Sequence, residues 1–158
     1  MFNEVCAQPT TRRPSSLTAA APAAGTANTN LLFRSIAYAG HVTDTKARFR
    51  VNFEVESLAT NEISAPLFEG DVALIAAKLP EALRIVSSAG RSRLFCATPG
   101  TYAVTLDLVA KITRAEPWNQ ISFIGPVSPI ASVNVEAAEA GIEMQLLSGT
   151  QLDPEQKA

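Results

Sequence analysis

Few residues in this chain have the side chains that acid–base or nucleophilic catalysis requires. His41 is the single histidine among 158 residues, and the two cysteines, Cys6 and Cys96, lie far apart in the sequence. A serine or cysteine mechanism through His41 would need a nucleophile and an orienting acid. The nearest acid is Asp44, and the chain contains no Gly-x-Ser-x-Gly turn that would expose a nucleophilic serine. We therefore expect His41 to be a surface residue at the end of a strand.

Metal ligands and phosphate-binding loops are equally sparse. A zinc site needs three or four His, Cys or carboxylate ligands at characteristic spacings, and the sequence has no such cluster. Its glycines stand alone at turn-like positions and do not form the glycine-rich loop that holds a nucleotide phosphate. The sequence therefore predicts neither a metal nor another cofactor.

One pair of carboxylates has a spacing that glycoside hydrolysis could use. Glu54 and Glu56 are two residues apart in a predicted strand, so their side chains would lie about 7 Å apart on one face. Arg48 and Arg50 share that face, and alternating charges of this kind are typical of a strand exposed to solvent. The pattern favours a protein that is not an enzyme and has no catalytic residue.

Trp118 is an aromatic residue whose neighbours are typical of a binding site. It is the only tryptophan, and Glu116, Asn119 and Gln120 surround it in a segment between two predicted strands. Sugar-binding modules stack pyranose rings on exposed aromatic side chains, and polar side chains nearby hydrogen-bond the hydroxyl groups. Alternatively, Trp118 folds back and caps one end of a sandwich, since large aromatic side chains gain most from burial. The candidate binding residues are thus Trp118, Glu116, Asn119 and Gln120, with a glycan as the ligand.

Length and charge limit the kind of protein further. A chain of 158 residues with 47% hydrophobic residues is long enough for one domain with its own core. Thirteen Lys and Arg residues against fifteen Asp and Glu residues give a net charge of −2, so no basic excess is present to neutralise a nucleic-acid backbone. No apolar run approaches the ~20 residues of a membrane-spanning helix. We expect neither a nucleic-acid partner nor a transmembrane segment.

The apolar residues repeat with a period of two, which is typical of half-buried strands. In 47–56 the odd positions are apolar from Ala47 to Val55, and the even positions are polar or charged. The segment 72–86 could also form a helix, but Pro80 interrupts it, and we assign it to two strands. The predicted strands span about 31–42, 46–57, 63–68, 71–78, 82–87, 92–96, 101–113, 120–125, 129–137 and 141–147.

Many short strands with one apolar face predict an all-β fold, an antiparallel β-sandwich of about nine or ten strands. The topology would be immunoglobulin-like or jelly-roll-like. The side chains predicted to fill the core are Phe49, Val51, Phe53, Val55, Leu74, Leu83, Ile85, Phe95, Tyr102, Val104, Leu106, Leu108, Phe123, Val133, Val135, Met144 and Leu146.

The two ends of the chain differ in composition from its centre. Residues 8–30 are rich in Pro, Thr, Ser and Ala without apolar periodicity, so they cannot bury enough surface to fold. We predict a disordered N-terminal tail at 1–30, a β-sandwich domain at 31–150 and a flexible C-terminal tail at 151–158.

The first residues bear on where the protein works. Val5, Cys6 and Ala7, followed by Gln8, are similar to the small-residue end of a secretory signal, without the apolar segment that precedes such an end. The match is either a coincidence or the end of a truncated leader. Together with the Pro/Ser/Thr/Ala spacer, it favours a secreted or cell-envelope protein. Because no pair of cysteines suggests a disulfide, a cytoplasmic protein is the alternative.

Three short motifs resemble those of known proteins. They are Tyr38-Ala39-Gly40-His41-Val42, Gly100-Thr101-Tyr102-Ala103-Val104 and Phe123-Ile124-Gly125-Pro126. In these patches the sequence resembles the β-rich extracytoplasmic modules of large bacterial envelope proteins, which carry a Tyr-x-Gly-x-Val opening and a Pro-Gly-x-Tyr strand start. The resemblance implies a non-catalytic module outside the cytoplasm, and it implies no role for any particular residue.

The hypothesis that follows is a non-catalytic structural or adaptor module that binds a protein partner, or a second copy of itself, through a sheet face or edge. Apolar residues on the solvent-facing side of the sheets would mark such an interface. Alternation places Leu147, Val109 and Val86 there. The alternative is a carbohydrate-binding module centred on Trp118.

Overall fold

The structure, a computed structural model, describes residues 15–19, 30–140 and 144–146. Over these residues the chain forms strands, turns and bends but no helix, so the prediction of an all-β fold is confirmed. None of the described segments is a helix long and apolar enough to cross a membrane. The strands are β1 (Ser15–Ala19), β2 (Leu31–Val42), β3 (Lys46–Ser57), β4 (Ile63–Gly70), β5 (Val72–Lys78), β6 (Leu83–Ser88), β7 (Arg91–Cys96), β8 (Gly100–Lys111), β9 (Thr113–Ala115), β10 (Trp118–Ile124), β11 (Ile130–Ala137) and β12 (Met144–Leu146).

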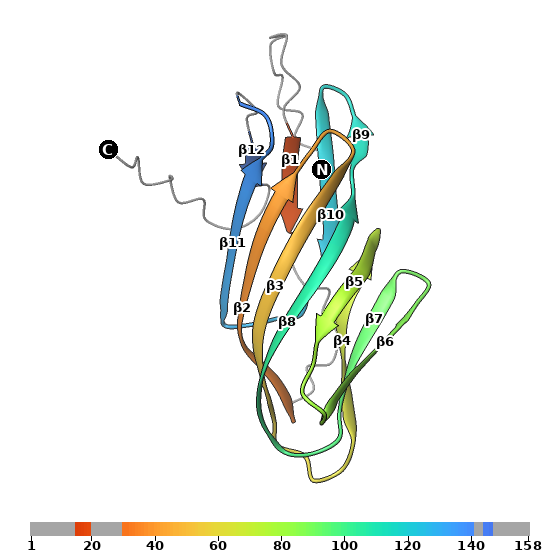
Figure 1. Ribbon diagram of the computed structural model, residues 1–158, viewed down its shortest axis with the longest axis vertical. Helices are drawn as coiled ribbons and strands as arrows, with labels where there is room; N and C mark the ends of the chain where they lie inside the picture. The colour runs from red at the N-terminus through yellow and green to blue at the C-terminus, as the bar shows by residue number, and fades with distance from the viewer. Residues whose placement is uncertain (1–14, 20–29, 141–143, 147–158) are drawn as a thin grey trace, which may run out of the picture.

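The first sheet contains five strands in the order β11-β2-β3-β8-β5. The long strands β2, β3 and β8 lie side by side and antiparallel along the long axis of the molecule (Figure 1). β5 pairs antiparallel with β8 at one edge, whereas β11 pairs parallel with β2 at the other. The parallel pair departs from the purely antiparallel sandwich that the sequence predicts. It is possible because the chain reaches β11 from the other sheet, so no hairpin fixes its direction.

The second sheet contains seven strands in the order β12-β1-β10-β4-β7-β6, with β9 paired to β10. β4, β7 and β6 pair antiparallel, whereas β1 lies parallel to both β10 and β12. β1 falls within 1–30, which the composition predicts as a tail. Its backbone pairing with two strands is a long-range contact that composition does not reveal. The ranges 1–14, 20–29 and 151–158 of the two predicted tails lie outside the described residues.

One apolar core fills the space between the two sheets. Phe123 of β10 packs against Tyr38, Phe49 and Phe68, with ring centroids at 6.0, 5.5 and 6.2 Å, so it joins the two sheets. The predicted core residues that are buried are Phe49, Val51, Phe53, Val55, Leu83, Val104, Leu106 and Leu108, and those half-buried against them are Leu74, Ile85, Tyr102, Phe123 and Val135.

Two residues that the sequence places in the core lie elsewhere. Phe95 is on the outer face of β7, because Leu94 and Cys96 occupy the inner positions of that strand. The guanidinium carbon of Arg84 lies 4.0 Å from the centroid of the Phe95 ring. Val133 is 40% exposed on β11, which is an edge strand of the five-stranded sheet. The predicted core positions of Met144 and Leu146 fall outside the part of the chain whose side chains are described.

Two other local predictions can be compared with the structure. The ambiguous segment 72–86 forms β5 and the first part of β6, as predicted, with Pro80 in the connection between them. Gly40, which the sequence places at a turn or strand end within the predicted strand 31–42, lies inside β2 opposite Phe49. The glycine is there because the Phe49 ring occupies the space of a Cβ atom.

Candidate functional site

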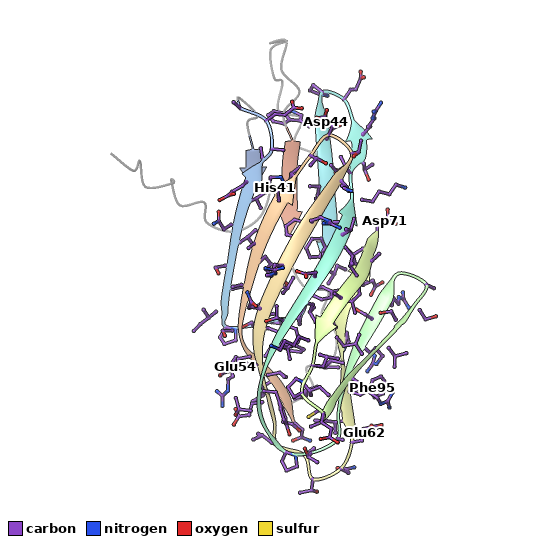
Figure 2. The ribbon with its side chains drawn as sticks, in the orientation of Figure 1. His41, Asp44, Glu54, Glu62, Asp71 and Phe95 are labelled. Atoms are coloured by element: carbon purple, nitrogen blue, oxygen red, sulfur yellow. The ribbon has the colours of Figure 1, made fainter. Side chains whose placement is uncertain are left out.

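His41, Glu54 and Glu56 lie on the outer face of the five-stranded sheet, with His41 far from the two glutamates. His41 is exposed and pairs with Arg48 across β2 and β3. Glu54 is six residues further along β3, which corresponds to about 20 Å, and Figure 2 shows His41 and Glu54 toward opposite ends of the sheet. Glu56 forms an ion pair with Arg34. His41 and Glu54 are therefore too far apart to act on one substrate atom.

Metal ligands are not brought together in the described part of the chain. No group of three His, Cys, Asp or Glu side chains there could hold a metal ion. Asp44 and Asp71, which lie in turns beside β3 and β5, point outward in Figure 2.

The predicted site around Trp118 is a hairpin of the seven-stranded sheet. A two-residue turn connects β9 to β10, and Glu116 in that turn is exposed. Trp118 is half-buried and shares one face of β10 with Gln120. Asn119 shares the opposite face with Ile121, which is buried in the core. The hairpin thus brings Trp118 and Gln120 to one side and directs Asn119 to the other.

A groove with a volume of about 700 Å³ crosses the outer face of the five-stranded sheet. Its floor consists of two neighbouring rows of side chains that pair across β2, β3 and β8. We call it the outer-face groove. Its floor residues are Ser35, Glu54 and Ala103 in one row and Ala37, Asn52 and Thr105 in the next.

Larger side chains stand at the two ends of the outer-face groove. On β11, Ile130 is 66% exposed and lies beside Ser132. At the other end, the groove is lined by Lys78, the last residue of β5, and by Leu79 and Pro80, which follow it. The face is hollow here because short side chains lie between longer ones.

The floor of the groove also carries polar groups. The Thr105 hydroxyl donates a hydrogen bond of 2.8 Å to the amide oxygen of Asn52, which leaves the NH₂ group of Asn52 to donate to a ligand. Glu54 and Lys78 supply one charge of each sign. A mostly apolar hollow with a few hydrogen-bonding groups is typical of a binding site.

The apolar residues that the sequence assigns to solvent do not form a single patch. Val86 is 46% exposed on the seven-stranded sheet, whereas Val109 is half-buried on the outer face of β8. Leu147 lies outside the described residues. An exposed apolar side chain does line the groove, namely Ile130, which is 66% exposed.

The outer-face groove was not predicted from the sequence, although the sequence contains a signal for it. Large apolar side chains were the expected sign of an interface, whereas the apolar residues in this floor are two alanines, Ala37 and Ala103. The outward positions of β2 include Ala37 and Ala39, and Ala103 occupies an outward position of β8. β3 between them carries charged residues such as Arg48 and Arg50 at its outward positions. The available signal for the groove was therefore the presence of alanines at outward positions of β2 and β8, the two strands on either side of the charged strand β3.

Comparisons with known proteins do not assign a family to this chain. No protein-family model matches it, and no curated protein sequence matches it. The M1 zinc metallopeptidase of Deinococcus radiodurans is similar at 14% sequence identity and a TM-score of 0.41, over 53% of this chain and 21% of that one. A mutant of that enzyme bound to a Tyr-Ser-Ala substrate has the same identity and TM-score, over 56% of this chain and 22% of its own. The chain spans about a fifth of the length of these structures, and a likeness at this level carries no conclusion about activity.

Proposed function

We propose that this protein is a non-catalytic β-sandwich adaptor that binds an extended segment of a partner protein in the outer-face groove. The observation that carries the proposal is the distribution of side-chain size across the sheet. Short side chains of β2 and β8 lie on both sides of Asn52 and Glu54 in the floor of the groove, and the exposed Ile130 and the half-buried Leu79 stand at its ends.

The groove has the dimensions of a peptide in extended conformation. It is lined from all five strands of the sheet or their ends, and four spacings between neighbouring strands amount to about 19 Å. Its two rows of side chains are about 7 Å apart. An extended peptide rises about 3.3 Å per residue, so about five or six residues would fill the groove.

The chemistry of the lining also suits a peptide. At Ala37 and Ala103 the floor allows the backbone of a ligand to approach the sheet closely. Asn52 and Thr105 can exchange hydrogen bonds with peptide amides, and Ile130 and Leu79 can contact apolar side chains at the two ends. Because Glu54 and Lys78 offer opposite charges, the groove does not select for a strongly charged ligand.

A sugar ligand is less well supported than a peptide. Sugar sites use the exposed face of an aromatic ring, and Phe53, the aromatic residue along the described groove, is 4% exposed and packs against Phe33 in the core. A glycan site at Trp118 would lose Asn119, which shares a face of β10 with buried Ile121. These positions favour the adaptor over the carbohydrate-binding module.

The proposal also places the module in the cell envelope or outside the cell. The support is the Pro, Thr, Ser and Ala composition of 8–30 and the resemblance to extracytoplasmic modules. Fractionation of the source cells, followed by an immunoblot for this protein, is expected to find it in the envelope or the medium. Detection in the cytosol alone would contradict the proposed location, and it would not bear on the proposal that the groove binds a peptide.

A pair of matched variants tests the groove. Ala37 and Ala39 are both exposed, lie two residues apart on the outer face of β2, and differ in that Ala37 lines the groove. In affinity capture from an envelope extract, Ala37→Arg should lower retention of the partner at least about tenfold, a loss of about 1.4 kcal/mol or more. The control Ala39→Arg should retain it like the unmodified protein. Equal retention by both variants would show that the groove is not the binding site.

A further inference from the structure

β11 is an exposed edge of the five-stranded sheet. It pairs with β2 on one side, and no strand in the described part of the chain pairs with its other side (Figure 1). Residues 130–134 and Glu136 are exposed, whereas Val135 and Ala137 are half-buried. An edge strand presents a row of unpaired N–H and C=O groups that can pair with another strand.

The backbone groups that face outward can be assigned by residue. The N–H of Ala138 donates to the carbonyl of Val42 in β2 at 2.9 Å. In a parallel pair, alternate residues direct both backbone groups toward the same neighbour. The even-numbered residues of β11 therefore bond to β2, and the odd-numbered residues, Val133 in the centre, direct their N–H and C=O groups away from the sheet.

β11 lacks the features by which edge strands avoid pairing. The opposite edge, β5, has an irregular register between Leu74 and Ala76 and ends in Lys78. β11 has a continuous register with β2, contains no proline or lysine, and carries one charge, on Glu136. Bulges, prolines and lysines are the usual protections of an edge, so among the described residues nothing blocks this edge from pairing with a further strand.

We propose that a second copy of this chain supplies that strand. The two β11 strands pair antiparallel about a two-fold axis at Val133 and join two five-stranded sheets into one continuous sheet. The inference goes beyond the adaptor function and does not rest on the outer-face groove.

The sequence of β11 is self-complementary in this register. With Val133 opposite its own copy, residues whose numbers sum to 266 face each other. Glu136 of one chain then lies opposite Ile130 of the other, so the two carboxylates are kept apart. Val135 faces Ala131 on one side of the sheet, and the polar Ser132 and Asn134 face each other on the other side.

The contact involves about eight residues from each chain, fewer than the twenty to thirty residues of a standard interface. The dimer should therefore be in equilibrium with the monomer. Sedimentation velocity of the full chain from about 1 µM to 1 mM is expected to show a rising dimer fraction. A protein that stays monomeric over this range overturns the proposal.

The variant Val133→Lys tests which edge is used. It places an inward-pointing charge on the edge, which is a natural protection against pairing. The control Val86→Lys makes the same change at a valine of similar exposure, 46% against 40%, on β6, an edge of the other sheet. We expect Val133→Lys to remove the dimer and Val86→Lys to keep it. Loss of the dimer with Val86→Lys alone would overturn the proposal.

Cysteine cross-linking detects the contact itself and not its loss in a variant. In a Cys6→Ser background, Val133→Cys should form an intermolecular disulfide under mild oxidation, because opposed residues of an antiparallel pair lie at disulfide distance. Val86→Cys should not form one. Cross-linking at position 86 alone, or at neither position while a dimer is present, would contradict pairing at β11.

Discussion

At the scale of single residues, Gly40 is constrained by the ring of Phe49. A Cβ atom at Gly40 would lie 2.6 Å from Cε1 of Phe49, which is 1% exposed in the core. The ring cannot move aside without disturbing its neighbours. We expect Gly40→Ala to lower the free energy of unfolding by about 1–3 kcal/mol in urea denaturation. Ala39→Ser on the outer face of β2 is the control, and an unchanged stability of Gly40→Ala would contradict this packing.

Tyr38 makes stability depend on pH in the alkaline range. Burial raises its pKa from 10.0 to about 12, because the phenolate would lose its hydration. The unfolded chain therefore releases this proton before the folded chain does. The contribution of Tyr38 to the free energy of unfolding is fully present below pH 10. It decreases by up to about 2–3 kcal/mol as the pH rises toward 12.

Denaturation of Tyr38→Phe beside the unmodified protein isolates that dependence. The difference in unfolding free energy between the two proteins should change between pH 10 and 12, since phenylalanine does not titrate. A difference that is constant over this range would mean that the Tyr38 hydroxyl is hydrated in the folded protein.

Phe95 shows where residue-level prediction from the sequence is limited. β7 is six residues long, and both of its faces contain apolar residues. A large aromatic residue favours burial, but Arg91 and Arg93 share its face, and the structure buries Leu94 and Cys96 instead. In such a short strand, the charged residues on a face predict which face is exposed better than the size of one aromatic side chain does.

At the scale of elements, the long strands could be predicted from the sequence with nearly correct ends. β3 is twelve residues long, and its alternation continues from Ala47 to Val55, so only one face can be apolar. β1 and β9 were missed because they have five and three residues and are held by pairing with β10. The parallel direction of β11 was also missed, since alternation does not encode direction.

The position of Trp118 in the β9–β10 hairpin allows the adaptor and the carbohydrate-binding module to be distinguished by fluorescence. Trp118 is the single tryptophan and lies on the seven-stranded sheet, away from the outer-face groove. We expect its fluorescence to stay unchanged when a panel of polysaccharides is titrated into the protein. Free tryptophan in the same solutions corrects for absorption. A saturable shift that Trp118→Phe abolishes would favour the carbohydrate-binding module instead.

At the scale of the whole molecule, the candidate site could not be predicted because it depends on the register of five strands. The floor of the groove combines Ala37 with Thr105, two residues that are distant in the sequence, through their pairing with Asn52. A shift of one residue in either pairing would move these side chains to the core. Composition and alternation predicted a sandwich, and the position of the hollow follows only from the alignment of its strands.

Selection from a library of linear peptides tests the central claim most directly. Peptides of about six residues would be selected on the immobilised protein and measured by titration against Ala37→Arg and Ala39→Arg, after circular dichroism confirms that both variants are folded. We predict that the selected peptides bind the unmodified protein and Ala39→Arg equally and bind Ala37→Arg at least about tenfold more weakly. Failure to select any peptide, or equal binding to all three proteins, would contradict a peptide-binding groove on the five-stranded sheet.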